Sequence, residues 1–474
     1  MVDTCYVGRL GALSLAAIGP SSAAFGFVFS TASSVLMVPT AVMISKARAK
    51  SNTVGVGRTL TFASALAAVL GIFLSWFFYV HCSVLLSVLG APTQALHLAI
   101  PYLRWRALSM PANLLLLVAA GACRGMKEPK VSLVNGFLIG GINMVLDPLL
   151  MFGLNLGTAG AAMATAAAQW ATLERAVMQV GLLAYIRYFW KRREELGLGN
   201  PTSLPTKKEM QEFIGASGTM FFRQLCNVGA WTLMASIASR MGVLEIAAHQ
   251  LILSMWLVIA FVQDSLGVAG QVLVSQYLGM SRDASGTPNQ KGEQSEAIIF
   301  QETARSVAKR VLTLSLGVGI VLASCSSVVV PLMLPLICHS AEVVKIVSQV
   351  FLMIMFAFPM CCLVWSWDAL FYGASDFVYN AKTVAVASAL GVAGTLCSLS
   401  RGWGVRGLWV SMTFVLFGVR LLAHTWRFNS PHGPFGAGQI TGEDKLGFGV
   451  QGQAPEPILG NVDSGGEFCM AAAA

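Results

Sequence analysis

The stretch Leu312–Ile337 reads LTLSLGVGIVLASCSSVVVPLMLPLI and contains no charged side chain. A helix needs about 20 apolar residues to cross the roughly 30 Å hydrocarbon core of a bilayer, so this stretch is long enough to span a membrane. Similar apolar runs lie within Val54–Leu98 and Val131–Met151. Of the 474 residues, 55% are hydrophobic and only 11% are charged, with a mean hydropathy of +0.69. Soluble domains carry about 25% charged residues, so the sequence predicts an all-α integral membrane protein.

Polar connections divide the chain into eleven predicted spans, near residues 12–43, 57–80, 95–122, 130–152, 157–187, 212–240, 245–279, 304–336, 342–372, 379–400 and 405–427. Lys and Arg gather in alternate connections, within 46–58, 124–130, 187–208 and 282–310. The intervening connections carry at most one basic residue, except 401–406, which has two. Basic connections face the cytosol in most membrane proteins. We therefore expect the linker 187–210 and the C-terminal tail on one cytosol-like side.

The two halves of the chain resemble each other. GRLGALSLAA at 8–17 aligns with SRMGVLEIAA at 239–248. Two weaker similarities follow in the same order, VPTAVMIS at 38–45 with VAGQVLVS at 268–275, and GTAG at 157–160 with GVRG at 404–407. Parallel repeats of this kind are related by a pseudo-two-fold axis along the membrane normal.

The repeat also predicts a missing segment. A complete span, 212–240, precedes the motif at Arg240, whereas only eight residues precede Arg9. We expect most of a first span, about 20 residues, to be absent here, and the intact fold to comprise two pseudo-symmetric six-helix lobes, twelve spans in all. The predicted domains are an N-terminal lobe at 1–188, a basic linker at 189–210, a C-terminal lobe at 211–428 and a disordered tail at 429–474, which is rich in Gly, Pro and polar residues.

Acidic side chains inside apolar spans are costly, so each needs a physical reason. Asp3, Asp147 and Asp368 are the three that stand out. Asn143 lies four residues before Asp147, so both project from one helix face. Such a carboxylate can load and release a proton or ligate Na⁺. The alternative is an aspartate at a helix end, satisfied by water or a neighbouring hydroxyl group.

Other polar residues lie within or near the spans, and interhelical hydrogen bonding explains most of them. Arg223 and Gln224 have a second interpretation, in which they face a central cavity and bind an anionic substrate. The candidate cavity residues are Arg223, Gln224, Gln250, Asp264 and Asp368. We interpret the aromatic residues of 365–372 as packing or lipid-facing surface rather than as a wall for stacking a drug.

Several function classes are excluded by motif. The chain contains no GxxxxGK[ST] loop and no soluble region long enough for an ATPase domain, so any transport by this chain would have to use an ion gradient. The ten Cys and six His show no metal-ligand spacing, and no metal or other cofactor is expected. The net charge of +9 sits in short connections, which argues against nucleic-acid binding. No nucleophile–base pair indicates an enzyme.

At this point the motifs resemble those of the multidrug and toxic compound extrusion (MATE) family. They are VDTCYVGRLG at 2–11, AGACRGMK at 120–127, NMVLDP at 143–148, GAAMAT at 160–165, AAHQ at 247–250, DSLGVAGQ at 264–271 and WDALFYGASDF at 367–377. The resemblance covers about residues 2–428 and is strongest to the DinF-like branch of plants and algae. It implies cation-coupled antiport, with a cation site in the N-terminal lobe that maps onto Asp3, Asn143, Asp147 and Thr165. That branch includes exporters of citrate and other organic anions, and plastid-envelope proteins.

We therefore expect a monomeric antiporter that exports a small organic molecule in exchange for H⁺ or Na⁺. The substrate is an organic anion such as citrate, or a xenobiotic or secondary metabolite. The multi-pass protein would lie in the plastid envelope or plasma membrane, with the lipid bilayer and its small-molecule substrate as its partners. Two alternatives stay open, a flippase for lipid or lipid-linked precursors, and an inactive truncated transporter.

Overall fold

The computed structural model describes residues 6–7, 10, 12–89, 93–170, 182–196, 206–284, 291–337 and 341–436. Across these ranges the regular structure is entirely helical. Eight helices are long and apolar enough to cross a membrane, and the pair Thr93–Leu108 and Met110–Gly125, bent by 45°, qualifies as a ninth span. Asp3 lies outside the described residues, as do residues 437–474. The predicted all-α membrane fold is confirmed.

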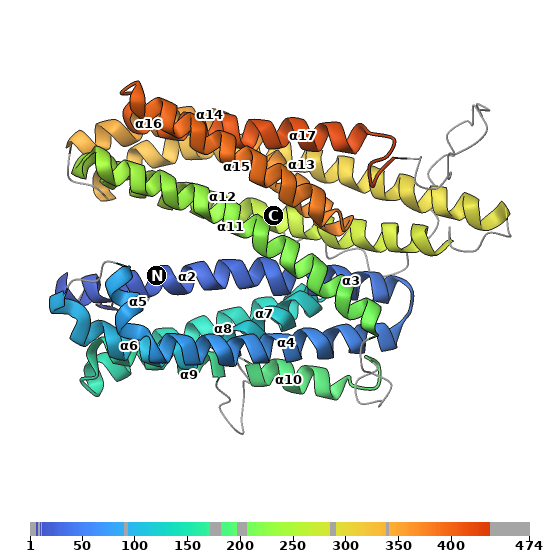
Figure 1. Cartoon of the computed structure of the whole chain (residues 1–474), viewed down its shortest axis with the longest axis horizontal. Coiled ribbons are helices and arrows are strands. Elements are labelled where there is room, and N and C mark those ends of the chain that lie inside the picture. Colours follow the sequence, from blue (N-terminus) through green and yellow to red (C-terminus); the bar gives the residue numbers. More distant parts are fainter. Residues whose placement is uncertain are drawn as a thin grey trace. The chain divides into compact units, whose positions relative to one another are not determined.

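The first half of the chain forms one group of helices, coloured blue to teal in Figure 1. Its elements are α2 (Ala12–Ala32), η1 (Ser33–Met37), α3 (Val38–Ala49), α4 (Thr53–Val80), α5 (Cys82–Val88), η2 (Thr93–Ala95), α6 (Leu96–Leu108), α7 (Met110–Gly125), α8 (Pro129–Pro148), η3 (Leu149–Gly153), α9 (Gly157–Trp170) and α10 (Leu182–Lys191). Small residues allow close packing here. A Cβ on Gly121 or Gly125 of α7 would lie 2.6 Å from a backbone oxygen of the rod formed by α2, η1 and α3, the close approach typical of membrane helices.

The second half forms the other group, coloured green to red. Its elements are α11 (Lys207–Met241), α12 (Val243–Ala284), α13 (Lys291–Ile337), α14 (Ala341–Gly373), α15 (Phe377–Ser400), α16 (Gly404–Val410), η5 (Ser411–Leu416) and α17 (Phe417–Asn429). A capping box begins α11, in which Thr206 and Glu209 satisfy each other's backbone N–H groups. All eleven predicted spans lie on helices over their described residues, but 157–187 and 212–240 are not among the helices that are long and apolar enough to cross a membrane.

The start of the predicted disordered tail differs from the expectation. Residues 430–436 fold back in tight turns after α17. Phe435 is buried and packs with Phe428 and Phe371. Gln301 of α13 donates a hydrogen bond to the Gly436 carbonyl oxygen at 2.5 Å. Burial of the Phe435 ring therefore carries the packed C-terminal lobe to Gly436, beyond its predicted end at residue 428.

Within the described ranges, three π-helical turns interrupt the spans, at η1, η3 and η5. Such turns often mark functional sites, because the extra residue frees backbone groups and shifts the register of the following turn. The turn η3 follows Pro148, whose missing N–H group loosens the helix directly after Asp147. Both η1 and the residues just after η5 border the cavity described below.

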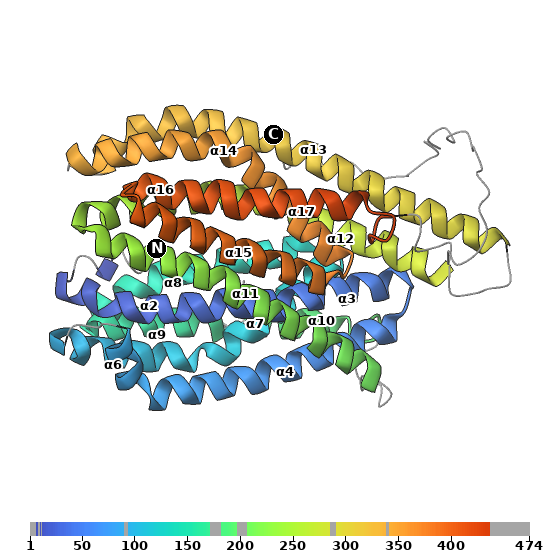
Figure 2. The same ribbon diagram turned by 45° about the horizontal axis from the view of Figure 1, so that its top comes forward.

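The two groups of helices meet along α11 and along the contact of α3 with α12. Figure 2 shows α11 between α2 on one side and α15 on the other. Ser275 Oγ donates a hydrogen bond to Ser45 Oγ at 2.6 Å, and Ser45 Oγ donates to the Val272 carbonyl oxygen at 3.1 Å. Ser45 and Ser275 end the two matching octapeptides of the repeat, so equivalent positions of the two lobes touch each other close to the pseudo-two-fold axis.

Further contacts close this end of the interface. Lys46 Nζ donates to Ser375 Oγ at 2.5 Å, and the Arg282 guanidinium donates to the Ala374 carbonyl oxygen at 3.2 Å. Lys46 and Arg282 belong to the basic connections 46–58 and 282–310, which the sequence predicts on the cytosol-like side. The lobes are therefore joined at that end in this conformation.

The proximity of Ser45 and Ser275 predicts a conformational lock. A Ser45→Cys/Ser275→Cys double variant should form a disulfide on mild oxidation, because the two Oγ atoms already touch, and the bond should prevent the lobes from separating. We expect transport in proteoliposomes to fall at least tenfold and to return on reduction. Each single variant controls for the native cysteines. Full activity of the oxidised, cross-linked protein would contradict a role of this contact in gating.

Candidate substrate and cation sites

The predicted N-lobe cation residues lie on two adjacent helices. Asp147 is fully buried on the last turn of α8, and Asn143 Nδ2 donates to Asp147 Oδ2 at 3.4 Å. Thr165 lies on α9, which packs against α8, and its hydroxyl donates to the Ala161 carbonyl oxygen of its own helix at 3.0 Å. The structure thus brings Asn143 and Asp147 together, and the role of Asp3 stays a prediction.

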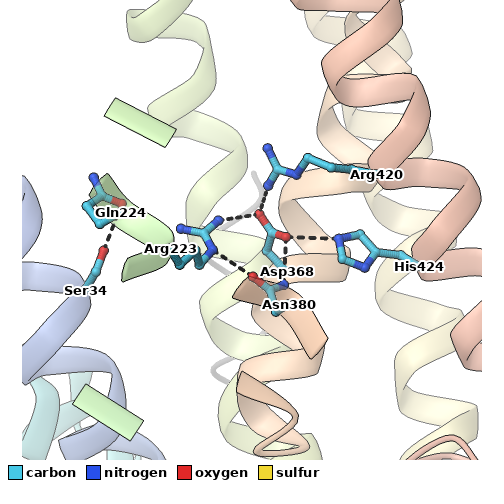
Figure 3. Close-up of polar contacts among 7 residues, drawn as sticks. All are labelled: Ser34, Arg223, Gln224, Asp368, Asn380, Arg420 and His424. Carbon is cyan, nitrogen blue, oxygen red and sulfur yellow. Dashed lines mark hydrogen bonds and ion pairs between the residues drawn. The ribbon is translucent and has the colours of Figure 1, made fainter. Parts of the chain in front are cut away.

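The C-terminal lobe contains a buried network of charges centred on Asp368 of α14 (Figure 3). Arg223 Nη2 of α11 donates to Asp368 Oδ2 at 2.8 Å, and Arg420 of α17 forms an ion pair with the same oxygen. On the other carboxylate oxygen, Asn380 Nδ2 donates at 2.9 Å and His424 Nε2 lies at 3.1 Å. Arg223 Nε also donates to Asn380 Oδ1 at 2.7 Å.

This geometry changes the interpretation of Asp368. Both carboxylate oxygens are engaged by donors, and four polar side chains surround them. Two guanidinium groups share one carboxylate, so the three charged residues leave an excess of one positive charge. The hypothesis that Asp368 forms a C-lobe cation site is not supported by this arrangement, because a further cation would face two arginines. Asp368 instead compensates the two buried cations.

A cavity of about 600 Å³ opens beside this network. Its wall includes Arg223 and Arg420, together with Gln224 and Asp264. The remaining lining residues come from α2, η1, α11, α12, α14 and α17, and are Phe29, Ser30, Ser33, Ser34, Asn227, Val228, Trp231, Leu253, Trp256, Leu257, Ala260, Phe261, Trp365 and Phe417. A cavity of this size, with an apolar wall and a few converging polar groups, is the usual form of a small-molecule site.

Only some of the candidate cavity residues therefore line the cavity. Arg223, Gln224 and Asp264 line the cavity, whereas Asp368 pairs with Arg223 and Arg420 and is not among the lining residues. Gln250 is exposed on α12 and is not part of the lining. Gln224 connects the two lobes across the cavity, because its Nε2 donates to Ser30 Oγ at 2.7 Å and its Oε1 accepts from Ser34 Oγ at 3.3 Å.

Three members of the network were missed in the sequence, namely Asn380, Arg420 and His424. Arg420 and His424 lie four residues apart within the predicted span 405–427 and project from one helix face. Intramembrane ionisable residues mark functional or paired sites. The same rule that selected the buried acids would have selected this pair if it had been applied to bases.

The shared counter-charge predicts a large effect on stability. Asp368→Ala leaves two buried guanidinium groups uncompensated, and we expect the free energy of unfolding to fall by about 3–5 kcal/mol. Asp376→Ala is the matched control, because Asp376 pairs with Arg427 at 3.0 Å in a partly exposed position and should contribute less than about 1 kcal/mol. Denaturant unfolding in detergent measures both. Equal losses of unfolding free energy in the two variants would contradict the role of Asp368 as the shared counter-charge of the two arginines.

Comparisons with known proteins agree with this architecture. A sequence model of the MatE family matches residues 1–149. Protein DETOXIFICATION 44, chloroplastic, of Arabidopsis thaliana is 27% identical over 92% of this chain and 79% of its own length. Protein DETOXIFICATION 45, chloroplastic, of the same plant is 26% identical over 92% of this chain and 75% of its own length.

Two solved structures show the same fold. A MOP superfamily transporter from Pyrococcus furiosus superposes with a TM-score of 0.71 at 17% identity, covering 90% of this chain and 89% of that one. The bent form of the Vibrio cholerae MATE transporter VcmN gives a TM-score of 0.72 at 17% identity, covering 90% of this chain and 91% of that one. The family match over residues 1–149, the plant relatives and the shared two-lobed fold together support a transporter of the multidrug and toxic compound extrusion family.

Proposed function

We propose that this transporter exports small organic anions in exchange for H⁺ or Na⁺. The observation that carries the proposal is the presence of two guanidinium groups, those of Arg223 and Arg420, on the cavity wall, where Asp264 is the one lining carboxylate among the described residues. Guanidinium groups bind carboxylates through paired, charge-assisted hydrogen bonds. An entering carboxylate competes with Asp368 for the two arginines, so the empty site is stabilised by an internal anion and the loaded site by the substrate.

Coupling to a cation is assigned to the N-terminal lobe. Asp147 is a buried carboxylate next to Asn143, outside the arginine network, and its lobe is joined to the other by the contacts of Ser45 and Gln224. An ion drives alternating access only if it binds one conformation more strongly than the other. A carboxylate that is dehydrated in one state and accessible in the other supplies that difference. Asp3 is proposed as the second acid of this site.

The same proposal includes location and assembly. Two plant relatives are named as chloroplastic, which supports the plastid envelope as the membrane. A single chain supplies residues from both lobes to the cavity, which supports a monomer as the transporting unit. Export of a lipid or lipid-linked precursor is the competing function. Its substrate would be much larger and more apolar than a small anion.

The anion and the cation sites predict separable defects. Arg420→Gln removes one guanidinium from the cavity wall, and we expect KM for an organic anion to rise about tenfold or more, since a hydrogen bond to a charged group contributes about 1.5–3 kcal/mol. Asp147→Asn should leave anion binding intact but make transport insensitive to an imposed H⁺ or Na⁺ gradient. Radiolabelled anion uptake into proteoliposomes measures both.

Arg427→Gln serves as the control, because this arginine pairs with Asp376 outside the cavity. It should transport like the unmodified protein. Gradient-driven anion transport by Asp147→Asn equal to that of the unmodified protein would overturn the assignment of the cation site. Scrambling of a fluorescent lipid without any anion transport would favour the flippase function instead.

A further inference from the structure

A second cavity, of about 740 Å³, lies in the N-terminal lobe and shares no lining residue with the cavity beside the arginine network. Both α4 and α10 pack on α7, and residues of all three helices line the cavity, so α7 forms the floor of a groove between the other two. We call it the lateral groove. Its lining residues are Leu60, Thr61, Ser64, Leu115, Ala119, Leu182, Tyr185, Ile186, Phe189, Trp190, Arg193 and Glu194.

The lateral groove lies in the half of the membrane next to the basic connections. Helix α4 begins within the connection 46–58, α7 ends at the connection 124–130, and α10 leads into the basic linker 187–210. Leu182 to Trp190 covers about 12 Å along α10, and the hydrocarbon of one leaflet is roughly 15 Å thick, half of the full core. The groove therefore spans about one leaflet, with Arg193 and Glu194 at the level of the lipid headgroups.

The open side of the lateral groove faces the lipid. On α10 the side chains of Ile186 and Trp190 are 50% and 67% exposed, whereas Tyr185 and Phe189 are buried. Tryptophan is enriched where the hydrocarbon meets the headgroups. Apolar side chains gain no hydrophobic free energy by leaving lipid for one another, so acyl chains fill such a groove through van der Waals packing. Selectivity among lipids must then come from its charged mouth.

A cation and an anion, Arg193 and Glu194, lie together at that mouth. Arg193 Nη2 lies 3.6 Å from Glu194 Oε1, and the two side chains are 47% and 89% exposed. An ion pair this exposed contributes little stability, so it opens readily for a ligand that offers both charges. The Arg193 guanidinium carbon also lies 5.4 Å from the centroid of the Trp190 ring, which keeps the cation at the rim of the groove.

The neighbouring residues hold this mouth in place. Arg192 forms ion pairs with Glu128 at 2.8 Å and with Glu195 at 2.7 Å, and Glu128 directly precedes α8. The turn after α10 is therefore fastened to another helix of the lobe by contacts that do not include Arg193 or Glu194. These two residues can exchange their own contact for a headgroup without loosening the turn.

We propose that the lateral groove binds one phospholipid with a zwitterionic headgroup. Its phosphate accepts hydrogen bonds from Arg193, its ammonium group pairs with Glu194, and one acyl chain lies along α4, α7 and α10. Guanidinium groups bind phosphates through charge-assisted hydrogen bonds. An anionic headgroup would meet Glu194 as a like charge, and a headgroup without charge would leave the pair of Arg193 and Glu194 intact. The proposal does not depend on anion export.

The first test titrates three lipids with identical acyl chains into the delipidated full chain. Dioleoylphosphatidylethanolamine is zwitterionic, dioleoylphosphatidylglycerol is anionic, and dioleoylglycerol has no headgroup charge. Native mass spectrometry measures the number of bound lipids and the dissociation constant of each. We expect one phosphatidylethanolamine per chain to bind about fivefold or more tightly than either of the others, an effect of the size expected for exposed charge pairs.

The second test changes the two charges at the mouth separately. Glu194→Gln removes the repulsion and should reverse the preference, so that phosphatidylglycerol binds as tightly as phosphatidylethanolamine or more tightly. Arg193→Gln should weaken both phospholipids about fivefold and leave dioleoylglycerol unchanged. Both side chains are exposed, so neither change threatens folding.

A third variant fills the apolar part of the groove. Ser64 is half-buried on α4, and Ser64→Phe should weaken the binding of all three lipids, because the larger ring occupies the space of the acyl chain. Arg401→Gln is the matched control. The Arg401 guanidinium also lies over an exposed tryptophan, at 5.6 Å from the Trp403 ring centroid, but outside the lateral groove, so lipid binding should not change.

The outcomes separate the headgroup from the site. Equal or tighter binding of phosphatidylglycerol to the unmodified protein would overturn the zwitterionic headgroup. Unchanged lipid binding in both Arg193→Gln and Ser64→Phe would overturn the lateral groove as the site, as would the absence of any lipid held at one per chain. If Ser64→Phe does not fold, the two charge variants still decide the question, since only a headgroup at this mouth is affected by them in opposite ways.

Discussion

A charge in the hydrocarbon core of a membrane must be paired, and the C-terminal lobe depends on this constraint. Asp368, Arg223 and Arg420 come from three different helices, α14, α11 and α17, and all three side chains are buried. Their pairing fixes how these helices pack, because moving one helix would leave a charge without its partner at a cost of several kcal/mol. The same network holds the guanidinium groups of Arg223 and Arg420 on the cavity wall, so it supports both the packing and the proposed selectivity for anions.

The internal repeat explains where the two lobes can move. Ser45 and Ser275 occupy equivalent positions of the two halves and touch each other near the pseudo-two-fold axis, so the helices α3 and α12 approach as a symmetric pair. A contact made of two hydroxyl groups contributes little stability, about 1 kcal/mol, and separates easily. Gln224 and the two serines of α2 and η1 form a second weak contact across the cavity. Weak, paired contacts at the lobe interface and strong contacts within a lobe suit a protein whose lobes move as units.

Much of this fold was predictable because its determinants are local. The span positions follow from hydropathy along the chain, and the twofold relation of the lobes follows from motifs such as those ending at Ser45 and Ser275. The approach of Asn143 to Asp147 was predictable for the same reason, since spacing along one helix fixes it. The cost of burying an acid likewise selected Asp147 and Asp368 correctly as residues that need an explanation.

The partners of those acids were not predictable, because they depend on how distant helices pack. Arg223 lies 145 residues from Asp368 and Arg420 lies 52 residues from it, so no local pattern distinguishes a carboxylate that binds a transported cation from one that compensates two arginines. The contact of Trp256 with Trp365 posed the same problem, since the two residues are far apart in the sequence and their rings meet only in the folded lobe. Burial cost identifies residues that matter, while tertiary packing decides what they do.

The central claim is that Asp368 balances the two arginines and takes no part in cation coupling. The most direct measurement is the number of H⁺ or Na⁺ ions bound per chain, by isotope binding and proton release, in the purified protein and in Asp368→Asn. The account predicts an unchanged number of bound cations together with stronger anion binding, because both guanidinium groups become available to the ligand. Loss of one bound cation per chain in Asp368→Asn would contradict it.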